Sequence, residues 1–176
     1  MRGVAAGAAL LLAACGGADA PAPPDNLILD AQGVVFARAD GTFDRHPFGT
    51  PRAAVEDAAD AVYGDASARR STNPECGAGP MAFTAYGAIQ LSFRDERLAG
   101  WTMRRGAVAV SEDGIAPGMT RMQLDRQAGV RLVAGSTLPG EFAYRTAAGT
   151  IGGVLAGTGP GATVEALFAG TTCTSR

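Results

Sequence analysis

The middle of the chain shows a strict alternation of apolar and polar side chains. Between positions 89 and 94, Ile, Leu and Phe alternate with Gln, Ser and Arg. A two-residue period is typical of a β-strand that buries one of its faces. After a polar turn at residues 94–97, a similar alternation continues over residues 98–103. The two stretches therefore predict an antiparallel β-hairpin.

The first half of the chain contains patterns for two short strands and a helix. Residues 27–29 and 34–36 are apolar and are separated by a short segment with Gly, which indicates a hairpin. Over residues 54–62, apolar side chains recur with the spacing of one helix face. Thr50 is the expected N-cap of this helix, and Gly64 is its expected end.

The order of helix and hairpin is then repeated. Residues 118–124 share Gly, Arg and a final aliphatic residue with residues 49–55, so a second, short helix is expected, ending near Gly129. Apolar residues 151–155 and 163–169 predict a second hairpin around a Gly-rich loop. A repeat of this kind indicates that the fold is built from two similar structural units.

These patterns together predict an α+β fold. We expect two tandem units, each a helix followed by an antiparallel β-hairpin or sheet, with the helices packed on one face of the sheet. The units would span about residues 26–110 and 111–176 of a single domain. A chain of this length can bury a modest core.

The N-terminus has the features of a signal peptide. Arg2 precedes an apolar run over residues 3–14, which is too short to span a bilayer. The run ends in Leu12-Ala13-Ala14-Cys15, which resembles the bacterial lipobox. The resemblance implies that residues 1–14 are removed and that Cys15 carries fatty acyl chains. The alternative is an ordinary secretory signal whose cleavage site happens to contain a Cys.

A lipidated Cys15 implies that the protein is located outside the cytoplasm and anchored to a membrane. Two or three acyl chains hold a protein stably, because each buried CH₂ contributes about 0.8 kcal/mol. An Asp directly after the lipidated Cys would resemble an inner-membrane retention signal. This position is Gly16, so the outer membrane is favoured. Residues 15–25 would be the lipidated Cys and a flexible Gly/Ala/Pro linker.

Charge and cysteine content agree with export. The formal net charge is −2, and loss of Arg2 would leave about −3, so we expect no nucleic-acid partner. Apart from Cys15, the chain has only Cys76 and Cys173, which can form a disulfide in an oxidising compartment. The alternative is a pair of buried free thiols.

The sequence offers little for catalysis. His46 is the only His and lies beside Pro47, which favours a surface turn. No zinc-binding spacing or nucleophilic Ser motif is present, so we expect no metal and no cofactor. Asp57 and Asp60 share one helix face, but a solvated face is the simpler interpretation. We therefore expect that the protein is not an enzyme.

A binding surface is the stronger prediction. Trp101 is the sole Trp and lies near Arg104 and Arg105, while Tyr86 and Arg94 fall on neighbouring predicted strands. Trp, Tyr and Arg on an open sheet face resemble an interface hot spot. The alternative is that Trp101 packs under a helix in the core.

The unit of a Gly-containing turn, a helix and a hairpin resembles a known group of folds. Gly118, Met119, Thr120, Arg121 and Leu124 look like the turn of the SmpA/OmlA outer-membrane assembly lipoproteins. The tandem arrangement resembles the β-lactamase-inhibitor-protein fold. The resemblance implies this fold over about residues 45–173. The chain departs from both groups, because the assembly lipoproteins usually have one unit and the inhibitors usually have more than one disulfide.

Three functions remain open from the sequence. The leading hypothesis is a non-enzymatic envelope lipoprotein that binds another envelope protein, or a wall component, through its sheet face. The second is a membrane-tethered inhibitor of a hydrolase. The third, an enzyme that uses Asp and Arg residues, has the least support.

Overall fold

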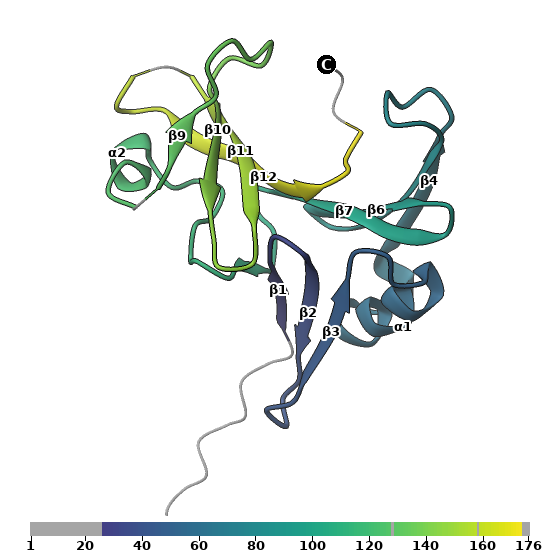
Figure 1. The fold of residues 1–176 in the computed structure, drawn as a ribbon. Helices are drawn as coiled ribbons and strands as arrows, with labels where there is room; N and C mark the ends of the chain where they lie inside the picture. The colour runs from purple at the N-terminus through teal and green to yellow at the C-terminus, as the bar shows by residue number, and fades with distance from the viewer. Residues whose placement is uncertain (1–25, 128, 158, 174–176) are drawn as a thin grey trace, which may run out of the picture.

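The computed structural model describes residues 26–127, 129–157 and 159–173, and its main feature is an eight-stranded antiparallel sheet (Figure 1). The strands lie in the order β4-β5-β6-β7-β12-β11-β10-β9. Their bounds are β4 Ala68–Asn73, β5 Met81–Tyr86, β6 Ile89–Arg94, β7 Arg97–Arg104, β9 Arg131–Leu132, β10 Glu141–Arg145, β11 Thr150–Ala156 and β12 Thr163–Gly170. The predicted signal peptide, Cys15 and the predicted linker lie outside the described residues.

The hairpin predicted from the alternation at residues 89–103 is confirmed as β6 and β7. Leu91 pairs with Trp101, and Gln90 with Thr102. At the turn, Asp95 and Glu96 have φ of 51° and 54°. Positive φ at two consecutive residues matches the right-handed twist of the strands that a tight hairpin joins. The second predicted hairpin is also present, as β11 and β12.

A smaller sheet has the order β3-β2-β1-β8. It consists of β1 Asn26–Leu29, β2 Gly33–Ala37, β3 Phe43–Pro47 and β8 Val110–Ser111. β1 and β2 form the first predicted hairpin, while β8 pairs with β1 in parallel. In Figure 1, β1–β3 lie with helix α1 on one side of the large sheet.

Helix α1, Arg52–Tyr63, follows the predicted apolar stripe. Val55, Ala58 and Ala59 are its buried residues, and Gly64 ends it with φ 81°. The N-cap is Pro51, one residue after the expected Thr50. A short 3-10 helix, η1 Asp65–Ser67, leads from α1 to β4.

The second predicted helix is only one turn long. Helix α2, Arg121–Leu124, begins with a capping box between Thr120 and Gln123. The capping box is a strong start signal, but one turn closes too few hydrogen bonds to form a packing layer. Leu124 is its one buried side chain.

The α+β prediction is therefore wrong. The described chain is mostly β, with 12 strands in two sheets, 45% strand and 13% helix, and it does not consist of two helix-plus-hairpin units. Strands that the sequence patterns did not predict contribute to this error in the fold class. β4 and β9 are edge strands, and their residues are mostly exposed, so they lack the alternation that marks a half-buried strand.

One main core joins the two sheets and α1. It contains Leu27, Leu29 and Phe36 from the small sheet, Val55 from α1, and one face of the large sheet. Trp101, Phe93 and Phe142 on that face are fully buried. Burial of each such side chain contributes roughly 2–3 kcal/mol. Among the described residues, no helix has the length and apolar character needed to cross a bilayer.

Candidate functional site

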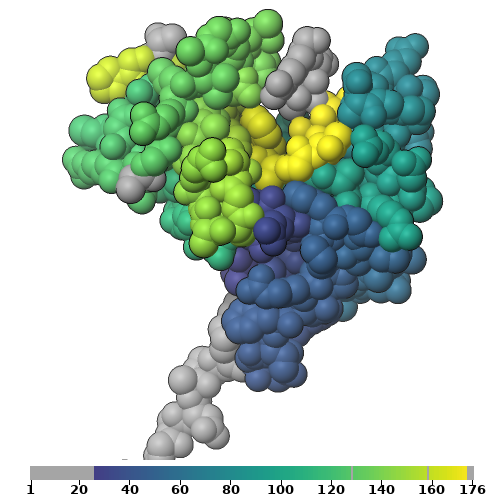
Figure 2. All heavy atoms as spheres, viewed as in Figure 1, coloured from purple at the N-terminus to yellow at the C-terminus, as the bar shows by residue number. Residues whose placement is uncertain are grey.

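The face of the large sheet that points away from the core is concave. In Figure 1, β9–β11 rise at one end of the sheet and β4 at the other, with β12, β7 and β6 between them. Figure 2 shows the hollow between these ends, with β12 and the following segment on its floor. We call this surface the concave face.

Strand register identifies a row of residues that crosses the concave face. Leu91 and Trp101 are core residues, so their strand neighbours Gln90 and Thr102 point to the opposite face. Following the cross-strand partners outward from this pair, the row reads Arg69, Ala85, Gln90, Thr102, Phe168, Gly152, Ala143 and Arg131. The six inner residues are half-buried and the two terminal arginines are exposed. We call this set the cross-sheet row.

Two glycines shape the floor. A Cβ on Gly152 would overlap the ring of Phe168, so the glycine lets that ring lie across β11. A Cβ on Gly100 would overlap the carbonyl oxygen of Thr171. The segment after β12 therefore approaches the backbone of β7, and the Thr171 N–H donates to the Ala99 carbonyl oxygen at 2.7 Å.

Unpaired arginines are the main charged feature of the concave face. Register places Arg104 and Arg145 on this side, in addition to the two arginines that end the row. All four are exposed, and none makes an ion pair with a described residue. The face therefore has four arginines without an ion pair in the described chain, beside the carboxylates of Glu75 and Glu141.

Arginines near α1 and on the small sheet behave differently. Arg52 and Arg70 both pair with Glu56, and Arg70 also pairs with Asp60 at 3.1 Å. On the small sheet, Arg38 pairs with Asp44 at 3.6 Å. These arginines therefore have carboxylate partners in the described chain, unlike the four arginines of the concave face.

The charged cluster between α1 and the sheet is structural. Glu56 accepts hydrogen bonds from Thr84 on β5 and from Arg52. Burial raises the pKa of Glu56, but the hydrogen bonds from Thr84 and Arg52 and the nearby arginine charges outweigh it, so the net shift is downward. The expected solvated face holds for Asp57, which is exposed, but not for Asp60, which faces the sheet and accepts a hydrogen bond from Tyr86.

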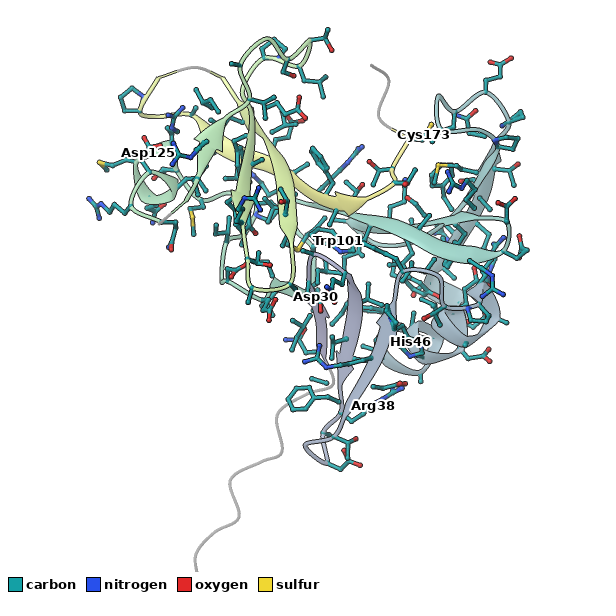
Figure 3. All side chains as sticks on the ribbon, viewed as in Figure 1. Asp30, Arg38, His46, Trp101, Asp125 and Cys173 are labelled. Atoms are coloured by element: carbon teal, nitrogen blue, oxygen red, sulfur yellow. The ribbon has the colours of Figure 1, made fainter. Side chains whose placement is uncertain are left out.

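Trp101 and Tyr86 are not part of an exposed binding face, so that prediction is wrong. The Trp101 side chain is fully buried, and its Nε1 donates to the Asp30 carbonyl oxygen at 2.8 Å (Figure 3). Tyr86 is 4% exposed, and its hydroxyl donates to Asp60 Oδ1 at 2.5 Å. The core alternative for Trp101 is confirmed.

The predicted arginines have different surroundings. Arg104 lies on the concave face, and Arg94 follows the core residue Phe93 on β6, which places it on the same side. Arg105 instead donates to Thr163 Oγ1 at 2.8 Å. The arginines that end the cross-sheet row were missed, because they lie on the edge strands that the sequence did not reveal.

The concave face contains a cavity of about 580 Å³ beside its Cys residues. It is lined by Asn73, Glu75, Cys76, Gly77, Ala78, Phe168, Gly170, Thr171, Thr172 and Cys173. We call it the thiol cavity. Its walls come from the β4–β5 loop, from β12 and from the segment after β12, which are far apart in the sequence.

Both expected cysteines lie at this cavity as free thiols. Cys76 is buried with Met81 and Phe83, and its Sγ lies 3.4 Å from the Met81 Sδ. Asn73 Nδ2 donates to Cys173 Sγ at 3.3 Å. A hydrogen bond with the Cys76 thiol, and then burial, raise the pKa of Cys173. The structure thus brings the two thiols together, while the disulfide itself stays a prediction.

His46 does not lie in a turn, so that interpretation is also wrong. It is a buried residue of β3, and its ring meets Phe36 edge-on at 5.5 Å. Its Nε2 lies 3.1 Å from Asp44 Oδ1. Within the described ranges, no group of three or more His, Cys, Asp or Glu is placed to hold a metal ion.

Comparison with known proteins assigns no relative. No protein-family model, curated protein or solved structure matches the chain significantly. The candidate site therefore consists of the concave face, its unpaired arginines and the thiol cavity, and its interpretation depends on the geometry of this chain.

Proposed function

We propose that the protein is a lipid-anchored, non-enzymatic component of the cell envelope that binds an acidic surface of another envelope protein. The concave face is the proposed binding surface, and acylated Cys15 is the proposed anchor. The linker between them would hold the concave face away from the membrane.

The unpaired arginines carry this proposal. Arg69 and Arg131 end a row that crosses the whole sheet, and neither has an ion-pair partner among the described residues. A chain with a net charge of −2 has enough carboxylates to neutralise them, as it does for Arg52 and Arg70. Their exposure on one face favours a partner with complementary carboxylates.

The residues in the middle of the cross-sheet row favour a protein partner rather than a small ion. Gln90, Thr102 and Phe168 offer a half-buried strip with both hydrogen-bonding and apolar groups. Protein interfaces combine an apolar centre with a polar, charged rim, and the row has this order from its middle to its ends. Arg is also enriched in protein interfaces and among their hot spots.

The binding test compares charge reversals on and off the concave face. The double variant Arg69→Glu/Arg131→Glu is produced in the native host as the full-length chain. Arg126→Glu is the single charge-reversal control, because Arg126 is exposed, follows α2 outside the strands, and has no ion pair with a described residue. Each chain is cross-linked in intact cells, recovered, and its partners are identified by mass spectrometry.

The expected result is an acidic envelope protein that the unmodified chain and the control recover and the double variant does not. Equal recovery by all three chains, or recovery of basic partners only, would contradict the proposal. A recovered hydrolase that the purified chain inhibits would instead support the inhibitor hypothesis. Mass spectrometry of the N-terminus tests the anchor, since an unacylated Cys15 or an intact leader would exclude it.

A further inference from the structure

The segment after β12 is held against the sheet by its backbone. Thr171 donates its N–H to Ala99, and Gly100 leaves room for the Thr171 carbonyl group. From there residues 171–173 run along the thiol cavity, and Cys173 lies near the β4–β5 loop in Figure 3. Its thiol is the contact that reaches across to that loop.

The other side of this contact is a small cluster separate from the main core. Cys76 is 7% exposed and packs with Met81 and Phe83, and Cys173 packs against the same cluster. Asn73 also donates to Cys173, from the end of β4. Two sulfur atoms and an amide therefore join the segment after β12 to the β4–β5 region.

We infer that Cys76 and Cys173 form a disulfide in the oxidised protein, and that this bond fixes residues 171–173 as one wall of the thiol cavity. The wall belongs to the concave face, so the bond would preserve the shape of the proposed binding surface. The bond can be tested without a partner and does not depend on the proposed function.

The chemistry needs an oxidant, and a low-molecular-weight disulfide such as oxidised glutathione is sufficient. The Cys173 thiolate, which lines the cavity, attacks one sulfur of the reagent and forms a mixed disulfide as the first glutathione thiolate leaves. Cys76 then loses its proton and attacks Cys173 Sγ, which releases the second glutathione. The two protein thiols lose two electrons and two protons, and the reagent becomes two thiols.

The order of attack follows from exposure. Cys173 is half-buried and Cys76 is buried, although both residues line the cavity. The raised pKa of Cys173 leaves little thiolate near neutral pH. Uncatalysed oxidation should therefore be slow and should accelerate about tenfold per pH unit until Cys173 ionises.

The test uses the full-length purified chain, reduced and then exposed to oxidised glutathione. Peptide mapping without reductant identifies the bonded cysteines. Hydrogen exchange at residues 171–173 reports whether the segment is held, and the melting temperature reports the effect on the whole fold. Cys76→Ser and Cys173→Ser are the matched variants. Each replaces one sulfur atom by oxygen, which prevents the disulfide and nearly keeps the size of the side chain.

The expected product is a bond between Cys76 and Cys173. With it, exchange at residues 171–173 should slow at least tenfold, and the melting temperature should rise by on the order of 10 °C. Neither change should occur in the two Ser variants. The inference is overturned if Cys15 takes one of the thiols, if both thiols stay alkylatable, or if the bond forms without slowing exchange.

Discussion

Arg69 and Arg131 lie at opposite ends of one row of cross-strand neighbours, although they belong to different halves of the chain. Arg69 is on β4 and Arg131 on β9, the two outer strands of the large sheet. The residues between them are half-buried and come from all six inner strands. Two positive side chains thus border a polar and apolar strip that no described segment covers completely.

This arrangement predicts that binding of the acidic partner depends on salt. Exposed charges act over about 8–10 Å at physiological ionic strength, so they mainly accelerate association. The double variant Arg69→Glu/Arg131→Glu should lower the association rate at least about tenfold in low salt, with a smaller effect on dissociation. Surface plasmon resonance with the identified partner measures both rates.

The Arg126→Glu control should change the association rate by less than about twofold, because Arg126 follows α2 and belongs to no strand of the concave face. A rate that is insensitive to salt and to both substitutions would exclude electrostatic recognition by this face.

Trp101→Phe should destabilise the fold by about 2–3 kcal/mol. The substitution removes the bond from Nε1 to Asp30 and leaves a buried carbonyl oxygen without its donor. It also leaves space in the centre of the core. Urea unfolding followed by circular dichroism gives the free energy.

Phe43→Ala is the control for loss of an aromatic side chain, because Phe43 is 62% exposed, and it should change the free energy of unfolding by less than about 0.5 kcal/mol. Because Trp101 is the sole Trp, the tryptophan fluorescence of the unsubstituted protein reports on this side chain alone. Its fluorescence should shift to the red on unfolding, and red-shifted emission from the native protein would show that the side chain is exposed.

Gly152→Ala should destabilise the protein by about 1–3 kcal/mol. The added methyl group would overlap the Phe168 ring, which packs on that glycine. Phe168→Leu should recover part of this loss in the double variant, because the two side chains compete for one space. A double-mutant cycle of unfolding free energies measures the coupling.

Gly161→Ala is a suitable control. Nothing lies within 4 Å of a Cβ at that position, and its backbone is not in the left-handed region. The substitution should be neutral or slightly stabilising, because it reduces the freedom of the unfolded chain. Additive effects of Gly152→Ala and Phe168→Leu would contradict the proposed contact.

Glu56 should make the stability depend on acidity. Its pKa in the folded protein is lowered, so ionised Glu56 stabilises the fold above the pKa of the unfolded chain. This contribution should be lost as the pH falls through the folded pKa. Thermal unfolding between about pH 7 and pH 2.5 should show a steeper acid loss for the parent than for Glu56→Gln.

Ala53→Gln, at an exposed position of the same helix, controls for surface changes on α1. Its profile should have the acid slope of the parent. Parallel profiles for the parent and Glu56→Gln would indicate that the bonds from Thr84 and Arg52 do not favour the ionised form of Glu56.

Local patterns explain why part of the fold could be predicted. The alternation in β6 and β7 and the stripe in α1 arise because each element buries one face, and that constraint appears in neighbouring residues. The tight turn at Asp95 and the capping box at Thr120 are equally local. The sequence also singled out Cys76 and Cys173, because only two cysteines remained beside Cys15, but it left a disulfide and two buried free thiols open.

The sequence by itself determined the central hairpins and the first helix. Only the tertiary structure decided which side of β7 is covered, and so placed Trp101 in the core and Arg104 on the concave face. It also revealed the edge strands with Arg69 and Arg131. The physical reason is that alternation defines two faces of a strand, whereas the segment that packs on one of them comes from elsewhere in the chain.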